Sequence, residues 1–160
     1  MKELHTGIYK VEGLVSNEDL ATLVDYINSV DDSEWFKKNS HGLFIEVDQE
    51  SVQQILDSYV TSLGEVFNGK IVLPVTRISR LIEGKNMGVH SDNLSQPKCI
   101  RGVILYLNDN YSGGEIHYRD VDVTYKPKAG SVIIHDSSYL HEVLPVTEGT
   151  RYMVTTFVWE

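Results

Sequence analysis

The chain has 160 residues, of which 41% are hydrophobic and 23% are charged, and these values are typical of one globular domain with a sizeable core. Fourteen basic and twenty-three acidic residues give a net charge of −9, which would repel nucleic acids and anionic membrane surfaces. The single cysteine, Cys99, excludes an internal disulfide and a cysteine-rich zinc site. No apolar run resembles a membrane span or a signal peptide, so we expect a soluble, cytoplasmic protein without a membrane partner.

Two amphipathic helices are predicted within the first 70 residues. Residues 16–30 begin with a Ser16 or Asn17 cap and acidic residues, and they place four apolar side chains on one face: Leu20, Leu23, Val24 and Ile27. Residues 50–67 repeat this helical spacing with Val52, Ile55, Leu56, Tyr59 and Leu63. In the segment between them, Trp35 and Phe36 either cover a substrate as a lid or anchor a loop to the core.

From residue 70 onward, the chain changes to short segments that are rich in β-branched and aromatic residues. Seven strands are predicted, at residues 70–82, 100–108, 114–120, 121–127, 131–136, 141–146 and 151–159. Turn sequences such as NDNYSGG, KPKAG and VTEGT separate them. This regular alternation of short strands and turns favours an antiparallel sandwich or barrel with the two helices packed on its outside.

The segment GVHSDNLS, residues 88–95, holds an imidazole and a carboxylate two positions apart, at His90 and Asp92. In an extended segment both side chains would point to the same face and could bind one metal ion. Two histidines and one carboxylate form the iron site that leaves three coordination positions open. His135 and His141 compete as the third ligand. The remaining histidines are interpreted as surface or ordinary strand residues: His5, His41 and His117.

Arg151 lies ten residues after His141 and could bind a co-substrate beside such a site. An iron site that activates dioxygen takes electrons from an organic co-substrate, commonly a keto-diacid whose far carboxylate needs a fixed cation. The planar fork of arginine suits that carboxylate. In a hairpin of residues 141–146 and 151–159, both side chains would share the inward face. The alternative for Arg151 is a surface ion pair at the start of a strand.

Together these residues resemble the iron- and 2-oxoglutarate-dependent dioxygenases of the prolyl 4-hydroxylase superfamily, which include enzymes that hydroxylate hypoxia-inducible factor. The resemblance extends from about Arg77 to Trp159 and rests on the order of its features: HSD at 90–92, YLN at 106–108, GGE at 113–115, KPKAGSVIIHD at 126–136, HEVLPV at 141–146 and Arg151. The chain departs from the family at Leu81 and Met87, where many prolyl hydroxylases carry tyrosines. This departure alters the rim of the substrate pocket.

The resemblance decides between His135 and His141 in favour of His141, because the family's ligand histidine follows the loop after its P-x-x-G strand. It implies an Fe(II) site with three ligands: His90, Asp92 and His141. Dioxygen is then the second co-substrate, and ascorbate is a further reductant.

The resemblance also assigns the 2-oxoglutarate site. It implies that Arg151 grips the distal carboxylate and that the Tyr106 hydroxyl donates to the same group. Thr155 and Phe157 share the strand parity of Arg151, so they should line the same pocket. Gly113 and Gly114 would permit a tight turn and have no chemical role.

Because the site residues must converge in one pocket, we expect a mainly β fold with flanking helices, a double-stranded β-helix or jelly roll. One domain would span residues 1–160, with residues 1–70 as helical support and residues 71–160 as the metal-binding core.

The implied function is hydroxylation of a C–H bond, foremost in a peptidyl proline. The alternatives are hydroxylation of a free amino acid or another small metabolite, and a non-catalytic jelly-roll binding module. The negative charge and the lack of a second arginine after Arg151 disfavour a nucleic-acid dealkylase, and the presence of Asp92 disfavours a halogenase.

Overall fold

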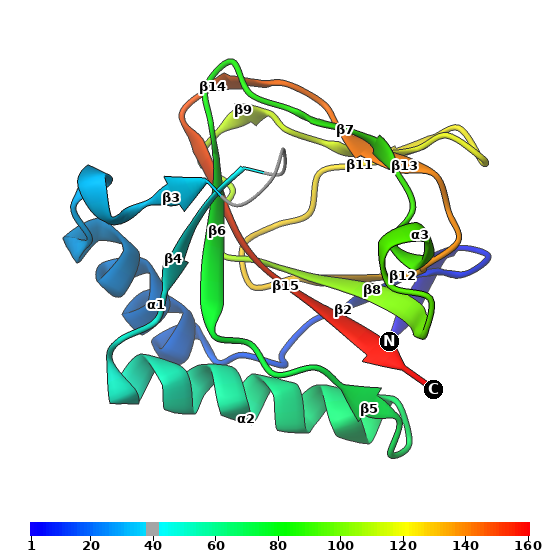
Figure 1. The fold of residues 1–160 in the computed structure, drawn as a ribbon, viewed down its shortest axis with the longest axis horizontal. Helices are drawn as coiled ribbons and strands as arrows, with labels where there is room; N and C mark the ends of the chain where they lie inside the picture. Colours follow the sequence, from blue (N-terminus) through cyan, green and yellow to red (C-terminus); the bar gives the residue numbers. More distant parts are fainter. Residues whose placement is uncertain (38–41) are drawn as a thin grey trace.

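The computed structural model of the protein describes residues 1–37 and 42–160. In this part of the chain the strands form antiparallel sheets (Figure 1). The largest sheet contains, in spatial order, β1 (Lys2–His5), β2 (Ile8–Val11), β12 (Val132–Asp136), β8 (Cys99–Tyr106), β15 (Thr150–Trp159), β6 (Arg77–Ile82), β4 (Leu43–Glu46) and β3 (Phe36–Lys37), while β5 (Ile71–Val72) pairs with the end of β15. A second sheet contains β11 (Val123–Tyr125), β10 (Ile116–Tyr118), β13 (His141–Val143) and β7 (Met87–His90), and a short ribbon pairs β14 (Val146–Glu148) with β9 (Ser112–Gly113).

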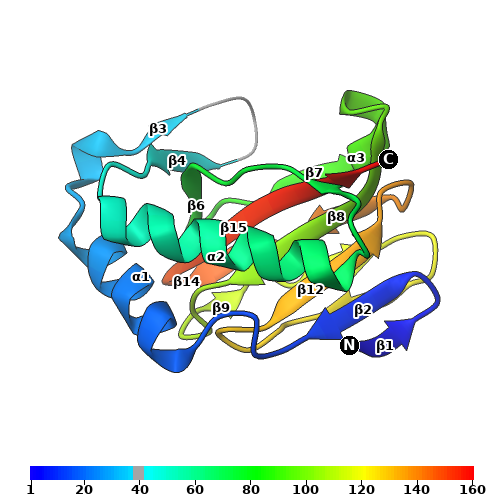
Figure 2. The same ribbon diagram turned by 90° about the horizontal axis from the view of Figure 1, so that it is seen from below.

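Two helices cover the outer face of the large sheet (Figure 2). α1 (Asn17–Ser29) begins after Ser16, whose hydroxyl accepts a hydrogen bond from the backbone of Asp19, so Ser16 is the cap. α2 (Glu50–Val66) buries four residues of its predicted apolar face: Val52, Leu56, Tyr59 and Leu63. The short helical turns η1 (Asp32–Glu34) and α3 (Asp92–Ser95) complete the described helices. None of these helices has both the length and the apolar character that crossing a membrane requires.

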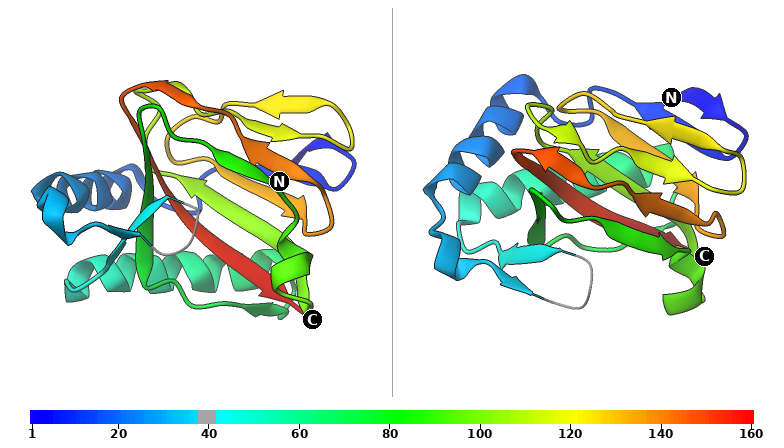
Figure 3. Two further views of the ribbon diagram at one scale, coloured as in Figure 1. Left: turned by 45° about the horizontal axis from the view of Figure 1, so that its top comes forward. Right: turned by 90° about the horizontal axis from the view of Figure 1, so that it is seen from above.

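Alternate side chains of the long strands pack on opposite faces of the large sheet. On β8, Val103 and Leu105 join the hydrophobic cluster beneath the helices, whereas Ile104 and Tyr106 belong to a second cluster that includes residues of the four-stranded sheet. The four-stranded sheet lies on the side of the large sheet away from α2 (Figure 3). Two antiparallel sheets that face each other form a double-stranded β-helix, which confirms the predicted fold class and the packing of both helices on one sheet.

The strands differ from the predictions at several points: β7 and β9 lie outside the seven predicted segments, and two further differences concern residues 1–82. The first 70 residues contribute β1, β2, β3 and β4 to the edges of the large sheet, in addition to the two helices. These strands have at most four residues each, too few for a clear alternating pattern. The strand predicted at residues 70–82 is divided into β5 and β6. Pro74 lies between them and has no N–H to donate to a continuous ladder.

Candidate functional site

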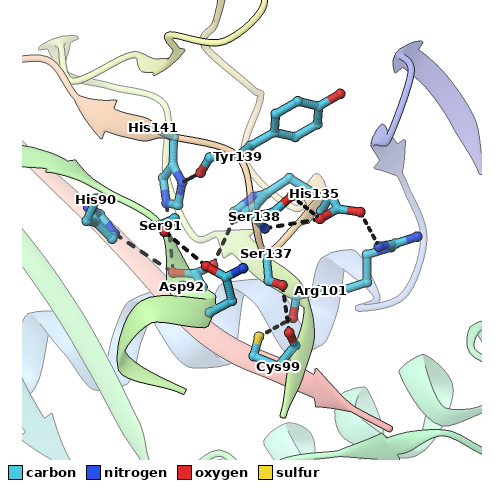
Figure 4. A network of polar contacts seen from close by, with 12 residues as sticks. His90, Ser91, Asp92, Cys99, Arg101, His135, Ser137, Ser138, Tyr139 and His141 are labelled. Atoms are coloured by element: carbon cyan, nitrogen blue, oxygen red, sulfur yellow. Dashed lines mark hydrogen bonds and ion pairs between the residues drawn. The ribbon is translucent and has the colours of Figure 1, made fainter. Parts of the chain in front are cut away.

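Three side chains of metal-ligand type converge where β7, α3 and β13 meet (Figure 4). One ligand atom from each of His90, Asp92 and His141 lies within 4.8 Å of the other two. The pairing of β7 with β13 places His90 directly opposite His141. The Oδ1 atom of Asp92 lies 3.9 Å from the Nε2 atom of each imidazole. The structure therefore brings the predicted two histidines and one carboxylate together around a space that suits one metal ion.

Each of these two imidazoles is held by a backbone carbonyl. His90 Nδ1 donates to the carbonyl of Gly88 at 2.8 Å, and His141 Nδ1 donates to the carbonyl of Tyr139 at 2.9 Å. With the proton on Nδ1, the lone pair of each ring lies on Nε2, the atom that faces the carboxylate. Burial, followed by the neighbouring His135, lowers the pKa of His141 to about 4. This ring is therefore neutral at pH 7, which is the state that binds a metal.

Asp92 does not continue the extended segment that the sequence predicted. It is the first residue of α3 and follows an extended Ser91. The backbone N–H of Asn93 donates to the carbonyl of Ser137, which ties α3 to the segment after β12. Burial alone would raise the pKa of Asp92, but the hydrogen bond from His135 and the nearby imidazoles outweigh burial and lower this pKa. The carboxylate is thus ionised at pH 7 and suited to a cation.

Arg151 is fully buried on β15. Its Nη2 atom donates to the hydroxyl of Tyr106 at 3.0 Å and its Nη1 atom donates to the sulfur of Met153, while Nε has no hydrogen-bond partner among the described residues. No carboxylate of residues 1–37 or 42–160 forms an ion pair with this guanidinium. A buried cation without a counterion is costly, so this position fits the carboxylate of a ligand.

The surroundings of Arg151 leave space for its side chain. Gly114 has a φ of +67°, and a Cβ atom there would lie 3.3 Å from Cδ of Arg151. The left-handed backbone conformation therefore favours glycine at this position, and a larger residue would push against the side chain of Arg151. Tyr111, which the sequence did not single out, buries its hydroxyl in this region without a hydrogen-bond partner among the described residues. Burial raises the pKa of Tyr111 to about 12, although the charge of Arg151 acts in the opposite direction.

A cavity of about 480 Å³ joins the three candidate ligands to Arg151. Thr155 and Phe157 line it together with Arg151, as the strand parity predicts. Tyr106 is absent from the lining of this cavity, and its hydroxyl contacts the guanidinium instead. Much of the remaining wall is apolar: Phe44, Pro74, Val75, Met87, Ile104, Ile116 and Val143. A volume of this order accommodates a small co-substrate together with part of a substrate.

The predicted hairpin between His141 and Arg151 is wrong. β13 carries His141 in the four-stranded sheet, whereas β15 carries Arg151 in the large sheet. Pro145 follows β13, and β14 then pairs with β9, so the chain crosses from one sheet to the other. His141 and Arg151 therefore line the same cavity from opposite sheets.

The two aromatic residues considered as a lid have different surroundings. Trp35 is buried in the cluster beneath the helices, where it packs against Tyr152 and the guanidinium of Arg80. It therefore anchors its segment to the core. Phe36 is more exposed and packs against Phe44, which lines the cavity.

The other histidines that the structure describes do not join the candidate metal ligands. His5 lies on β1, and His117 on β10 hydrogen-bonds to Thr124. His41 lies outside the described residues. His135 is buried, and its Nε2 atom lies 2.9 Å from Oδ2 of Asp92. Sequence reasoning missed this contact, for which the signal was a polar residue at an inward position of the apolar strand SVIIHD.

Comparisons with known proteins agree with this geometry. The family model of the 2OG-Fe(II) oxygenase superfamily matches residues 76–159, slightly more than half of the chain. A PKHD-type hydroxylase of Prochlorococcus marinus is 33% identical over 89 residues, which cover 52% of this chain and 40% of the relative. The chain spans less than half of the length of such curated relatives.

Solved structures share the fold over nearly the whole chain. A Pseudomonas putida prolyl-4-hydroxylase matches with a TM-score of 0.74 and 19% identity, over 96% of this chain and 92% of that one. The viral collagen prolyl hydroxylase of Paramecium Bursaria Chlorella virus-1, in its 2OG complex, has a TM-score of 0.74 and 18% identity, over 95% of each chain. The superfamily uses Fe(II), 2-oxoglutarate and dioxygen, and both the three clustered donors and the buried Arg151 fit this requirement. The chain belongs to the 2OG-Fe(II) oxygenase superfamily.

Proposed function

We propose that the protein is a hydroxylase in which His90, Asp92 and His141 bind Fe(II). The donor set supports this proposal, because two imidazoles and one carboxylate provide the iron site of oxygenases that need open coordination positions. The backbone hydrogen bonds to both Nδ1 atoms orient the rings before a metal arrives.

Arg151 and Tyr106 would hold the distal carboxylate of 2-oxoglutarate. The single observation that carries the proposed function is the burial of Arg151, without an ion-pair partner among the described residues, in the cavity that also contains the candidate metal ligands. The Tyr106 hydroxyl accepts a hydrogen bond from Arg151 and can direct its own proton to a carboxylate. Thr155 and Phe157 would form the wall beside the co-substrate.

When bound, Fe(II) and 2-oxoglutarate would supply, with dioxygen, the oxidation that converts a C–H bond into C–OH while 2-oxoglutarate becomes succinate and carbon dioxide. The protein's own part is to orient the co-substrate between Arg151 and the metal ligands and to keep water out. The apolar side chains of the cavity wall serve the second purpose.

We propose a peptidyl proline as the substrate. The likeness in fold to two prolyl hydroxylases supports this choice, as does an apolar cavity wall that suits a pyrrolidine ring. A free amino acid or another small metabolite is the alternative, since Met87 lines the cavity where many prolyl hydroxylases carry a tyrosine.

Two measurements test the proposed function. In an anaerobic titration, Fe(II) should bind tightly and 2-oxoglutarate should then produce the visible absorption band of its iron chelate. A chain that binds neither would be a non-catalytic jelly-roll module. Succinate release should next be compared across proline-containing peptides, free amino acids, other metabolites and nucleotides. Release that only a free amino acid stimulates would overturn the peptidyl-proline assignment and leave the hydroxylase assignment intact.

A further inference from the structure

A line of three buried polar side chains leads from the inner core to the candidate metal site. Tyr118 on β10 and His135 on β12 are 0% and 1% exposed, and Asp92 is 8% exposed. The Tyr118 hydroxyl lies 3.0 Å from Nδ1 of His135, and Nε2 of His135 lies 2.9 Å from Oδ2 of Asp92. A tyrosine of one sheet is thus connected through a histidine of the other sheet to the candidate metal ligand.

The direction of the second of these hydrogen bonds follows from the chemistry of its two groups. The ionised carboxylate of Asp92 can only accept, so His135 donates from Nε2. Nδ1 of His135 faces the hydroxyl of Tyr118, a group that can either donate or accept. His135 thus has one buried partner at each ring nitrogen, Tyr118 at Nδ1 and Asp92 at Nε2, and a shift of the imidazole in either direction would break a buried hydrogen bond.

The backbone of β8 makes room for this contact at Gly102. The register of β12 with β8 places Gly102 directly opposite His135, and the register of β15 places it opposite Phe157. A Cβ atom at Gly102 would lie 2.2 Å from Oδ2 of Asp92 and 2.4 Å from Nε2 of His135. The carboxylate and the imidazole therefore occupy the space that a side chain on β8 would fill.

Because of this contact, the two carboxylate oxygens of Asp92 have different surroundings. Oδ2 of Asp92 is engaged by His135, whereas Oδ1 is equally distant from Nε2 of His90 and from Nε2 of His141, at 3.9 Å. A carboxylate without such a contact could turn about its terminal torsion, which is soft, and present either oxygen or both. Here a buried hydrogen bond selects one orientation.

We propose that His135 is a positioning residue that, supported by Tyr118 and seated over Gly102, fixes the carboxylate of Asp92 so that only Oδ1 faces the metal. This inference rests on the proposed metal site. His135 itself does not occupy a ligand position: its Nε2 atom is directed to Oδ2, and the residue is not among the donors that cluster within 4.8 Å.

The role can be tested by titrating Co(II) into the metal-free chain of 160 residues and following both the heat of binding and the visible absorption of the cobalt site. His135→Leu introduces an apolar side chain of similar size and removes the donor. It should lower the Co(II) affinity about 10-fold to 100-fold, the range typical of groups that orient metal ligands. His135→Gln places an amide N–H near the position of Nε2, so it should restore affinity to within about threefold of the wild type.

Two further variants test the same contact between His135 and Asp92 by changing a neighbouring residue. Tyr118→Phe removes only the outer hydrogen bond and should cause a smaller loss than His135→Leu. Gly102→Ala removes no polar atom, yet it should weaken Co(II) binding and change the cobalt spectrum because its methyl group displaces both partners. The matched control is His117→Leu, a strand histidine that hydrogen-bonds to Thr124 away from the site and should leave the affinity unchanged.

The outcomes separate three explanations. If His135→Leu binds Co(II) as tightly as the wild type, with an unchanged spectrum, the positioning role is refuted. If His135→Leu and His135→Gln both abolish binding as completely as His141→Ala, His135 is a ligand and the inference is also refuted. If the wild type binds neither Co(II) nor Fe(II), the proposed function fails, and the inference fails with it. If His135→Leu folds poorly, the Co(II) affinities of His135→Gln, Tyr118→Phe and Gly102→Ala still test the positioning role.

Discussion

Arg151→Met should separate the stability of the fold from the binding of 2-oxoglutarate. The substitution removes the guanidinium and keeps a long, apolar side chain in the same buried position. In the wild type this cation has no carboxylate partner among the described residues, and its removal relieves a desolvation cost. We therefore expect the melting temperature of the ligand-free variant to be unchanged or higher than that of the wild type.

The affinity for the co-substrate should change in the opposite direction. Without Arg151 the distal carboxylate of 2-oxoglutarate is buried without its partner, which costs about 2–5 kcal/mol. At about 1.4 kcal/mol for each factor of ten, the dissociation constant of 2-oxoglutarate should rise about 30-fold to 4,000-fold. Pyruvate lacks the distal carboxylate and should lose little, so the preference for 2-oxoglutarate over pyruvate should collapse.

The assay is an anaerobic titration of the Fe(II)-loaded protein with each keto acid, followed by the chelate absorption band, together with a thermal melt of the ligand-free protein. The matched control is Arg101→Met, because Arg101 also lies on a strand but pairs with Asp136 at 2.8 Å and is partly exposed. An Arg151→Met protein that kept its preference for 2-oxoglutarate would refute the assignment and point to another cation, such as Arg77 or Arg80. A large loss of stability would show that the guanidinium supports the fold.

Three other changes have defined outcomes. His141→Ala should abolish Fe(II) binding measured by calorimetry at pH 7, whereas His117→Ala should bind like the wild type; binding retained by His141→Ala would exclude it as a ligand. Tyr106→Phe should weaken 2-oxoglutarate about tenfold to a hundredfold, the loss of one hydrogen bond to a charged group, with Fe(II) affinity unchanged. Gly114→Ala should lower the free energy of unfolding in urea by about 1–2 kcal/mol because of its φ of +67°. It should also weaken 2-oxoglutarate through displacement of Arg151, and an unaltered affinity would show that the guanidinium has room to adjust.

Local patterns in the sequence were sufficient to predict much of the fold. The spacing of apolar residues predicted α1 and α2, with a cap at Ser16 or Asn17 for α1, and the β-branched segments predicted most of the strands after residue 70. These features depend on local geometry, which a short window contains. The order of the motifs from His90 to Arg151 also indicated the superfamily, because the composition of a site can be recognised without its coordinates.

Only the tertiary structure decided how distant segments meet. It placed His141 and Arg151 on opposite sheets, and it began α3 at Asp92. It also brought His135, 43 positions away in the chain, against Oδ2 of Asp92 over the bare backbone of Gly102. The sequence indicated an inward Arg151, but only the structure showed that Tyr106 and Met153 are the groups to which its guanidinium donates. Such relations depend on which strands pair and which faces are enclosed, and many remote contacts determine those together, so no single stretch of sequence contains them.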